Sequence, residues 1–246
     1  MIKGLYTSAL GLSALNVQQE VTANNLANAN TPGYKKDVMV SASFPEMLLY
    51  RLNDPEVKGN PPQVGKVAMG VAVEGVHTDY SAGLKRQSDN PLTLAIEGEG
   101  YFIVNTPRGE RYTKNGEFNL DAEGRIVSQD GYALLGQKGE IVVKNGDLQV
   151  DREGRVYSGG TEVDRLKIVS FATPLTKEGA SLFQGENPGE VGNPVIYQGF
   201  VEESNVLIVA EMINMIQVMR SYEANQKVVQ TIDGTLDKAV NEVGRV

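Results

Sequence analysis

The first helical segment of the chain ends in the stretch Ala23-Asn24-Asn25-Leu26-Ala27-Asn28-Ala29-Asn30-Thr31-Pro32-Gly33-Tyr34-Lys35-Lys36. Asparagine is a poor helix former because its side chain competes for main-chain hydrogen bonds, so four asparagines within seven positions are unusual in a freestanding helix. In a helix–helix contact, the same side chains can exchange amide hydrogen bonds; a loosely ordered helix end is the alternative. Pro32 stops the helix, because proline disfavours helical geometry in the residue before it.

Upstream of this stretch, residues 2–28 contain no proline and carry a helical pattern. Positions at alternating spacings of three and four form a seam that is apolar for two heptads and then turns polar: Ile2, Leu5, Ala9, Leu12, Asn16, Gln19, Ala23 and Leu26. A polar seam position specifies register and partner at a cost in stability. The pattern therefore predicts a helix with a specific partner.

A second helix is predicted at the other end of the chain, from a cap at Ser204 or Asn205 to about residue 243. Its three-four seam is Ile208, Met212, Met215, Met219, Tyr222, Gln226, Val229, Asp233, Leu236, Val240 and Val243. About forty residues at 1.5 Å each extend about 60 Å, so such a helix needs a partner along most of its length. That partner is either the first helix of the same chain or a helix of another copy.

The middle of the chain, residues 41–199, holds most of the glycines and nine of the ten prolines. Short β-type runs are separated there by turn pairs such as Asn115-Gly116 and Asn145-Gly146. Residues 114–128 recur as residues 144–158, with eight of fifteen positions identical. Each copy supplies an Asn-Gly turn and an Asp-x-Glu-Gly turn, and the glycine of the second turn is expected in the left-handed conformation.

These patterns predict an α+β fold. Long N- and C-terminal helices form a coiled-coil-like assembly domain, and the central domain is all-β, with short strands and hairpins. The predicted boundaries are residues 1–40 for the N-terminal half of the helical domain, 41–80 for an extended linker with a leucine-bearing segment, 81–200 for the β-rich outer domain, and 201–246 for the C-terminal half of the helical domain.

Composition excludes several classes of function. The 246 residues include no cysteine and one histidine, His77, and the formal charge is −8. Without cysteine there is no disulfide scaffold, no thiol nucleophile and no cysteine-ligated zinc site. The net negative charge argues against nucleic-acid binding. The sequence contains no run of 18 apolar residues, so we expect no membrane-spanning helix. The N-terminus lacks the apolar core and cleavage site of a secretory signal. We expect no catalytic residues, no metal site and no cofactor.

Several motifs, in chain order, resemble the bacterial flagellar hook–basal-body rod protein family. They are Asn24-Asn25-Leu26-Ala27-Asn28, Thr31-Pro32-Gly33-Tyr34, Ala95-Ile96-Glu97-Gly98-Glu99-Gly100-Tyr101-Phe102, Tyr112-Thr113-Lys114-Asn115-Gly116-Glu117-Phe118, Gly131-Tyr132, and residues 203–225. Within the family, the leucine-bearing residues 44–51 are similar to the distal rod members, and residues 163–167 to the proximal rod members.

The resemblance implies a structural protein that leaves the cell through the flagellar type III export apparatus without a cleaved signal. It also implies self-assembly, in the periplasm, into a helical tube that acts as the drive shaft of the motor. The implied partners are further copies of the chain, other rod proteins, the hook protein and the surrounding ring proteins.

We therefore predict an assembly interface built from both terminal helices, the asparagine-rich stretch and the leucine segment. Its residues are Leu5, Leu12, Asn16, Gln19, Asn24, Asn25, Leu26, Asn28, Pro32, Gly33, Tyr34, Leu48, Leu49, Met212, Ile216, Met219, Tyr222 and Val229. The rival interpretation is a secreted or cytoplasmic β-domain glycan-binding protein or hydrolase with a coiled-coil dimerisation module. The absence of tryptophan and an aromatic content of 7% argue against a glycan binder.

Overall fold

The computed structural model describes residues 2–44, 46–50, 63–143 and 148–243. The chain divides into two compact units. We call residues 1–26, 37–77 and 208–246 the helix unit, and residues 27–36 and 78–207 the β unit. The chain therefore passes from one unit to the other four times, after residues 26, 36, 77 and 207.

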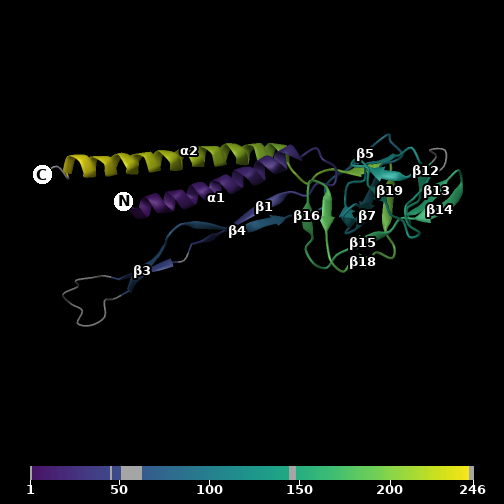
Figure 1. The fold of residues 1–246 in the computed structure, drawn as a ribbon, viewed down its shortest axis with the longest axis horizontal. Helices are drawn as coiled ribbons and strands as arrows, with labels where there is room; N and C mark the ends of the chain where they lie inside the picture. Colours follow the sequence, from purple (N-terminus) through teal and green to yellow (C-terminus); the bar gives the residue numbers. More distant parts are fainter. Residues whose placement is uncertain (1, 45, 51–62, 144–147, 244–246) are drawn as a thin grey trace. The chain divides into compact units, whose positions relative to one another are not determined.

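The helix unit contains two long helices, as predicted. Helix α1 (Ile2–Ala27) and helix α2 (Ile208–Lys238) lie side by side with the two chain ends at the same end of the pair, so they are antiparallel (Figure 1). A π-helical turn, η1 (Ala239–Val243), follows α2. The 31 residues of α2 extend about 46 Å at 1.5 Å per residue. Neither helix is long and apolar enough to cross a membrane.

A two-stranded ribbon completes the helix unit. β1 (Asp37–Ser43) pairs with β4 (Val71–Thr78), and β2 (Glu46–Tyr50) pairs with β3 (Gln63–Ala68). The ribbon contacts α1 at the turn between β3 and β4, where the Thr7 hydroxyl donates to the carbonyl of Met69 over 3.1 Å. The rings of Tyr6 and Phe44 meet edge to face at 6.4 Å. The ribbon therefore packs on α1.

The β unit consists of short strands, as predicted. They are β5 (Lys85–Gln87), β6 (Leu94–Glu97), β7 (Tyr101–Thr106), β8 (Gly109–Thr113), β9 (Phe118–Leu120), β10 (Ile126–Ser128), β11 (Ala133–Leu134), β12 (Leu148–Val150), β13 (Arg155–Ser158), β14 (Thr161–Arg165), β15 (Ile168–Ser170), β16 (Thr176–Glu178), β17 (Leu182–Gln184), β18 (Gly189–Glu190), β19 (Val195–Gln198) and β20 (Phe200–Glu202).

The largest sheet orders its strands β16-β17-β8-β7-β11-β10-β9, with β15 paired to both β7 and β18. A three-stranded sheet, β12-β13-β14, and the pairs β19–β6 and β20–β5 complete the unit. Strand β7 is buried on both faces, with Phe102 in one hydrophobic cluster and Tyr101 and Ile103 in a second. The main core of the chain therefore lies in the β unit, on both sides of β7.

The internal repeat forms two equivalent turns. In the first, Asp121 accepts from the main-chain N–H of Arg125 over 2.7 Å and pairs with its guanidinium, also over 2.7 Å. In the second, Asp151 and Arg155 repeat both contacts at 2.9 and 2.6 Å. The turn glycines have φ of +78° and +82°, which confirms the left-handed glycine that the pattern predicts. The predicted Asn145-Gly146 turn lies outside the described residues.

Candidate functional site

The α1–α2 contact uses positions shifted from the predicted seam. On α2 and the first residue of η1, the partly or fully buried positions again follow spacings of three and four: Glu211, Met215, Val218, Tyr222, Asn225, Val229, Ile232, Leu236 and Ala239. On α1, Gly4 faces Ile232 and Gly11 faces the Asn225 amide. Glycines at these two positions let α2 approach the α1 backbone closely, whereas the predicted α1 seam contains neither glycine. The predicted seam was therefore only partly right.

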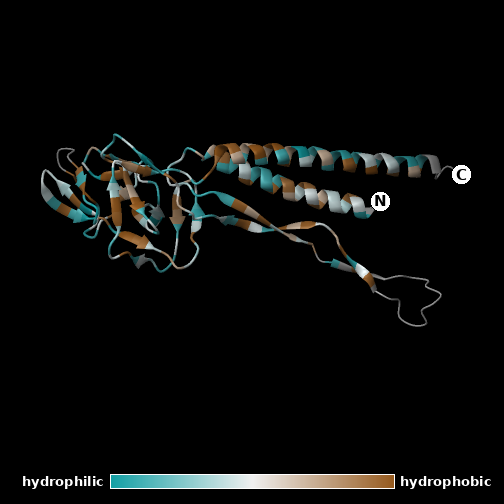
Figure 2. Ribbon diagram, turned by 180° about the vertical axis from the view of Figure 1, so that it is seen from behind, coloured by the Kyte–Doolittle hydropathy of each residue, from teal (hydrophilic) through white to brown (hydrophobic). Residues whose placement is uncertain are grey.

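The shifted contact leaves an apolar stripe of α2 uncovered. Met212 is 51% exposed and Met219 is 49% exposed, with Ile208, Val209, Ile213 and Ile216 similarly open. Figure 2 shows this hydrophobic stretch at the N-terminal end of α2, with hydrophilic residues following it. After Met219, the exposed positions are mostly polar, beginning with Arg220, Ser221 and Glu223. Large apolar patches on a soluble protein mark interaction sites.

The predicted interface residues fall into three groups. Exposed residues are Asn16, Asn24, Leu48, Met212, Ile216 and Met219. Partly buried residues are Leu5, Leu12, Gln19, Leu26, Asn28, Pro32, Tyr222 and Val229, and fully buried residues are Asn25, Gly33 and Tyr34. The side chain of Leu49 lies outside the described residues, although its main chain pairs with Gly65 in the ribbon. In a single chain, the exposed residues are therefore accessible to a neighbouring copy, whereas the fully buried residues are not.

Asn25 has an internal role that the sequence did not predict. Its amide Nδ2 donates to the carbonyl of Asp37 over 2.8 Å, and its Oδ1 accepts from the N–H of Asp37 over 2.9 Å. The asparagine-rich helix end is therefore ordered, and this side chain fixes the start of β1 against the end of α1.

Gly33 and Tyr34 are buried in the β unit. Gly33 has φ +68°, and a Cβ there would overlap the main chain of Lys114 and Asn115, so glycine is required. The Tyr34 ring lies 3.8 Å from the Nζ of Lys177, which also donates to the carbonyl of Lys35 over 2.7 Å. The Thr-Pro-Gly-Tyr motif thus places the next two residues, Lys35 and Lys36, in the β unit.

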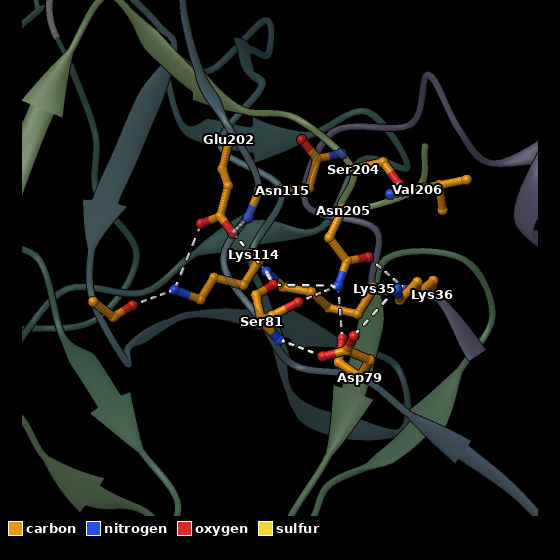
Figure 3. Close-up of polar contacts among 12 residues, drawn as sticks. Lys35, Lys36, Asp79, Ser81, Lys114, Asn115, Glu202, Ser204, Asn205 and Val206 are labelled. Atoms are coloured by element: carbon orange, nitrogen blue, oxygen red, sulfur yellow. Dashed lines mark hydrogen bonds and ion pairs between the residues drawn. The ribbon is translucent and has the colours of Figure 1, made fainter. Parts of the chain in front are cut away.

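We call Lys35, Lys36, Asp79, Ser81, Glu202 and Asn205 the junction clasp (Figure 3). Lys35 Nζ lies 2.6 Å from Glu202 Oε1 and donates to the carbonyl of Ser81 over 2.8 Å. The N–H of Lys36 donates to Asn205 Oδ1 over 2.7 Å, and Asn205 Nδ2 donates to the carbonyl of Asp79 over 2.8 Å. Asn205 therefore bridges the main chain of Lys36 and Asp79, where the chain leaves and re-enters the β unit, and does not cap α2.

The central charges of the clasp are buried and paired. The side chains of Lys35 and Glu202 are 1% and 3% exposed, and the buried Lys114 Nζ lies 3.6 Å from the other carboxylate oxygen. Burial alone raises the pKa of Glu202, but the lysine charges and the Gly83 N–H outweigh burial, so its pKa lies below the usual value. Burial lowers the pKa of Lys114. Hydrogen bonds from Ser81 lower the pKa of Asp79.

The clasp gathers the ends of the chain segments that enter and leave the β unit. Residues 33–36 follow α1 and precede β1, Asp79 follows β4, and residues 202–206 precede α2. All of these segments are hydrogen-bonded to one another within the β unit. The clasp therefore joins these segments through the buried Lys35–Glu202 ion pair and the hydrogen bonds of Asn205.

Sequence reasoning missed Lys35, Lys114, Glu202 and Asn205 as a group. Lys35 and Glu202 are separated by 167 positions, so no spacing rule connects them. The available signal was weak: a glutamate directly after the apolar pair Phe200-Val201, in a short strand. In the fold, the Gly33 N–H donates to the carbonyl of Glu202 over 2.8 Å, which holds Glu202 beside the segment that carries Lys35.

Three family models match the chain. The model for "Flagella basal body rod protein" matches residues 5–35, the "Flagellar hook protein FlgE/F/G D1 domain" matches residues 95–160, and the "Flagellar basal body rod FlgEFG protein C-terminal" matches residues 197–242.

Curated relatives match over their full length. The flagellar basal-body rod protein FlgG of Buchnera aphidicola subsp. Schizaphis graminum is 31% identical, over 97% of this chain and 98% of that protein. FlgG of Borreliella burgdorferi is 32% identical, over 98% of each. The flagellar hook-basal body complex protein FlhO of Bacillus subtilis is 30% identical, over 100% of each.

Proposed function

Because this chain belongs to the flagellar basal-body rod protein family, a family of structural proteins and not of enzymes, we propose that it is a subunit that assembles into the helical, tubular drive shaft of the flagellum. In this role it transmits motor torque to the hook. Full-length similarity at about 30% to relatives named FlgG supports the distal rod type.

The observation that carries this proposal is the uncovered stripe of α2, which includes Met212, Ile216 and Met219. One chain buries the opposite face of α2 against α1 and leaves these side chains about half exposed. Burying apolar surface contributes about 25 cal/mol per Å², so a neighbouring copy that covers the stripe gains stability. The stripe therefore supports assembly through the helix units.

The position of the stripe favours an open polymer. A stripe packed on the same stripe of a second copy gives a closed dimer, whereas a stripe packed on a different surface gives a filament. The candidate second surface is the part of α1 that carries Leu5 and Leu12, both of which are only partly buried in one chain. Gly4 lies beside Ile232, at the opposite end of the helix pair from the stripe. Stripe-to-leucine contacts therefore join copies head to tail.

The junction clasp gives torque a path through each subunit. Connections made only of exposed single strands would yield under load, whereas segments bonded through a buried ion pair resist separation, because breaking such a pair leaves an uncompensated charge. We infer that load entering through the helix unit reaches the β unit at Lys35 and Glu202.

The proposal includes a location and partners. The rod lies in the periplasm, and its neighbours are further copies, other rod proteins, the hook protein and the surrounding rings. The subunit reaches that place through the flagellar type III export apparatus without a cleaved signal. These statements rest on family membership.

Electron microscopy of the purified chain at high concentration tests the proposal. Wild-type protein is expected to form helical polymers. Leu12→Asp and Met219→Asp are expected to abolish polymers and motility, while Gln226→Asp, an exposed polar position on the same helix, keeps both. Circular dichroism confirms that each variant is folded. Discrete closed dimers at all concentrations would contradict the proposal.

A further inference from the structure

A pocket of about 470 Å³ opens on the β unit next to the clasp. Its lining residues include Tyr80, Tyr101, Phe171, Lys35 and Lys114, and Lys114 Nζ lies 5.4 Å from the centre of the Tyr101 ring. This volume is within the range of pockets that hold small organic ligands or a single side chain. The pocket therefore joins an aromatic wall to two ammonium groups.

Positive charge exceeds negative charge at the buried end of the pocket. Two lysine side chains, 1% and 6% exposed, face one carboxylate, that of Glu202. Glu99 also lines the pocket, but it is exposed, so water screens its charge. A buried unbalanced charge is costly unless a further group compensates for it. An anion in the pocket would supply that compensation.

Hydrogen-bond donors remain available in the pocket. Lys35 Nζ donates to Ser81 and Glu202, which leaves one of its three protons. Lys114 Nζ donates to the carbonyl of Gly98 over 2.7 Å and faces Glu202 at 3.6 Å. Tyr101 is only 8% exposed, and its hydroxyl has no hydrogen-bond partner within the described parts of the chain. Among the described residues no fully buried side-chain nitrogen or oxygen lacks a partner, so the Tyr101 hydroxyl is open to the pocket that the residue lines.

We propose that this pocket binds a carboxylate on a short aliphatic arm, with its oxygens accepting from Lys35, Lys114 and the Tyr101 hydroxyl. The arm packs against the rings of Tyr80 and Phe171. The recognised chemistry is shared by free organic acids and by the acidic side chains of proteins. Binding here is independent of whether the helix units polymerise.

Titration of the full chain labelled with ¹³C at tyrosine Cζ tests the site. Butyrate represents free acids, the capped tripeptide acetyl-Gly-Glu-Gly-amide represents acidic side chains, and the glutamine analogue and sodium chloride are controls. The Tyr101 Cζ resonance is identified by its loss in Tyr101→Phe. We expect one or both carboxylates to shift this resonance in a saturable way, and we expect neither control to shift it. Response to butyrate alone indicates free acids as the ligand, and response to the tripeptide alone indicates protein side chains.

Variants separate binding from folding. Lys114→Met leaves Lys35 paired with Glu202 and is expected to weaken carboxylate binding roughly tenfold or more, the usual effect of losing a charge-assisted hydrogen bond. Arg86→Met, at an exposed cation outside the pocket, leaves binding unchanged. If Lys114→Met unfolds, Tyr101→Phe serves instead: it should weaken binding in calorimetry without lowering stability. Absence of a saturable shift with both carboxylates, or a clear loss of stability in Tyr101→Phe, overturns the proposal.

Discussion

Lys35 Nζ and Glu202 Oε1 lie 2.6 Å apart, although 167 positions separate the two residues in the chain. Lys35 follows α1 and Glu202 closes the strand before α2, so this contact fastens the segment leaving one terminal helix to the segment leading into the other. Both side chains are buried. The pair is therefore the central contact of the junction clasp.

Glu202→Gln is expected to destabilise the β unit by about 3–5 kcal/mol, because it leaves the buried charges of Lys35 and Lys114 without an anion. Urea unfolding followed by circular dichroism measures this loss. The matched control is Glu203→Gln, which removes an exposed pair with Arg86 and should cost at most about 1 kcal/mol. Equal effects of the two variants would contradict a special role for the buried pair.

Stability should fall in acid partly through Glu202. Its folded-state pKa is lowered below the ordinary value of 4.5, so the folded protein binds fewer protons there than the unfolded chain. The stabilisation is complete above pH 4.5 and is lost as the pH falls through the folded-state pKa. Urea midpoints measured from pH 7 downward should therefore converge for wild type and Glu202→Gln. A constant difference down to the lowest pH would contradict the pKa shift.

Gly33→Ala is expected to cost more than Gly98→Ala. Both glycines have positive φ, at +68° and +81°, so alanine strains the backbone by about 1 kcal/mol at either site. At Gly98, the added Cβ meets open space, whereas at Gly33 it overlaps the main chain of Lys114 and Asn115. Thermal unfolding of the two variants measures the difference. Similar melting temperatures would show that the Gly33 segment shifts without cost.

Asn25→Ala is expected to destabilise the helix unit by roughly 2 kcal/mol, because it removes the two hydrogen bonds that Asn25 makes with the main chain of Asp37. Asn16→Ala, an exposed position on the same helix, is the control and should change stability by less than about 0.5 kcal/mol. Hydrogen exchange at the Asp37 amide gives a local readout, with faster exchange expected only in Asn25→Ala.

Periodicity and turn chemistry predicted the two terminal helices, the short strands and the repeated Asp-x-Glu-Gly turns, because each depends on local residue spacing. They did not predict which face of α2 packs on α1. That choice depends on Gly4 and Gly11, small residues that carry no apolar signal but allow close approach. The clasp was equally inaccessible, since its members come from strands and loops that only the folded topology brings together.

Disulfide trapping between copies tests the head-to-tail contact most directly. The chain has no cysteine, so Leu5→Cys with Met219→Cys introduces the only thiols. The two cannot join within one chain: in the register that sets Gly4 beside Ile232, they are about twelve residues apart along the helix pair, or about 18 Å, and a disulfide needs Cα atoms within about 7 Å. Head-to-tail assembly predicts a ladder of covalent oligomers from the double variant and monomers from each single variant. A covalent dimer from Met219→Cys alone, without a ladder from the double variant, would contradict it.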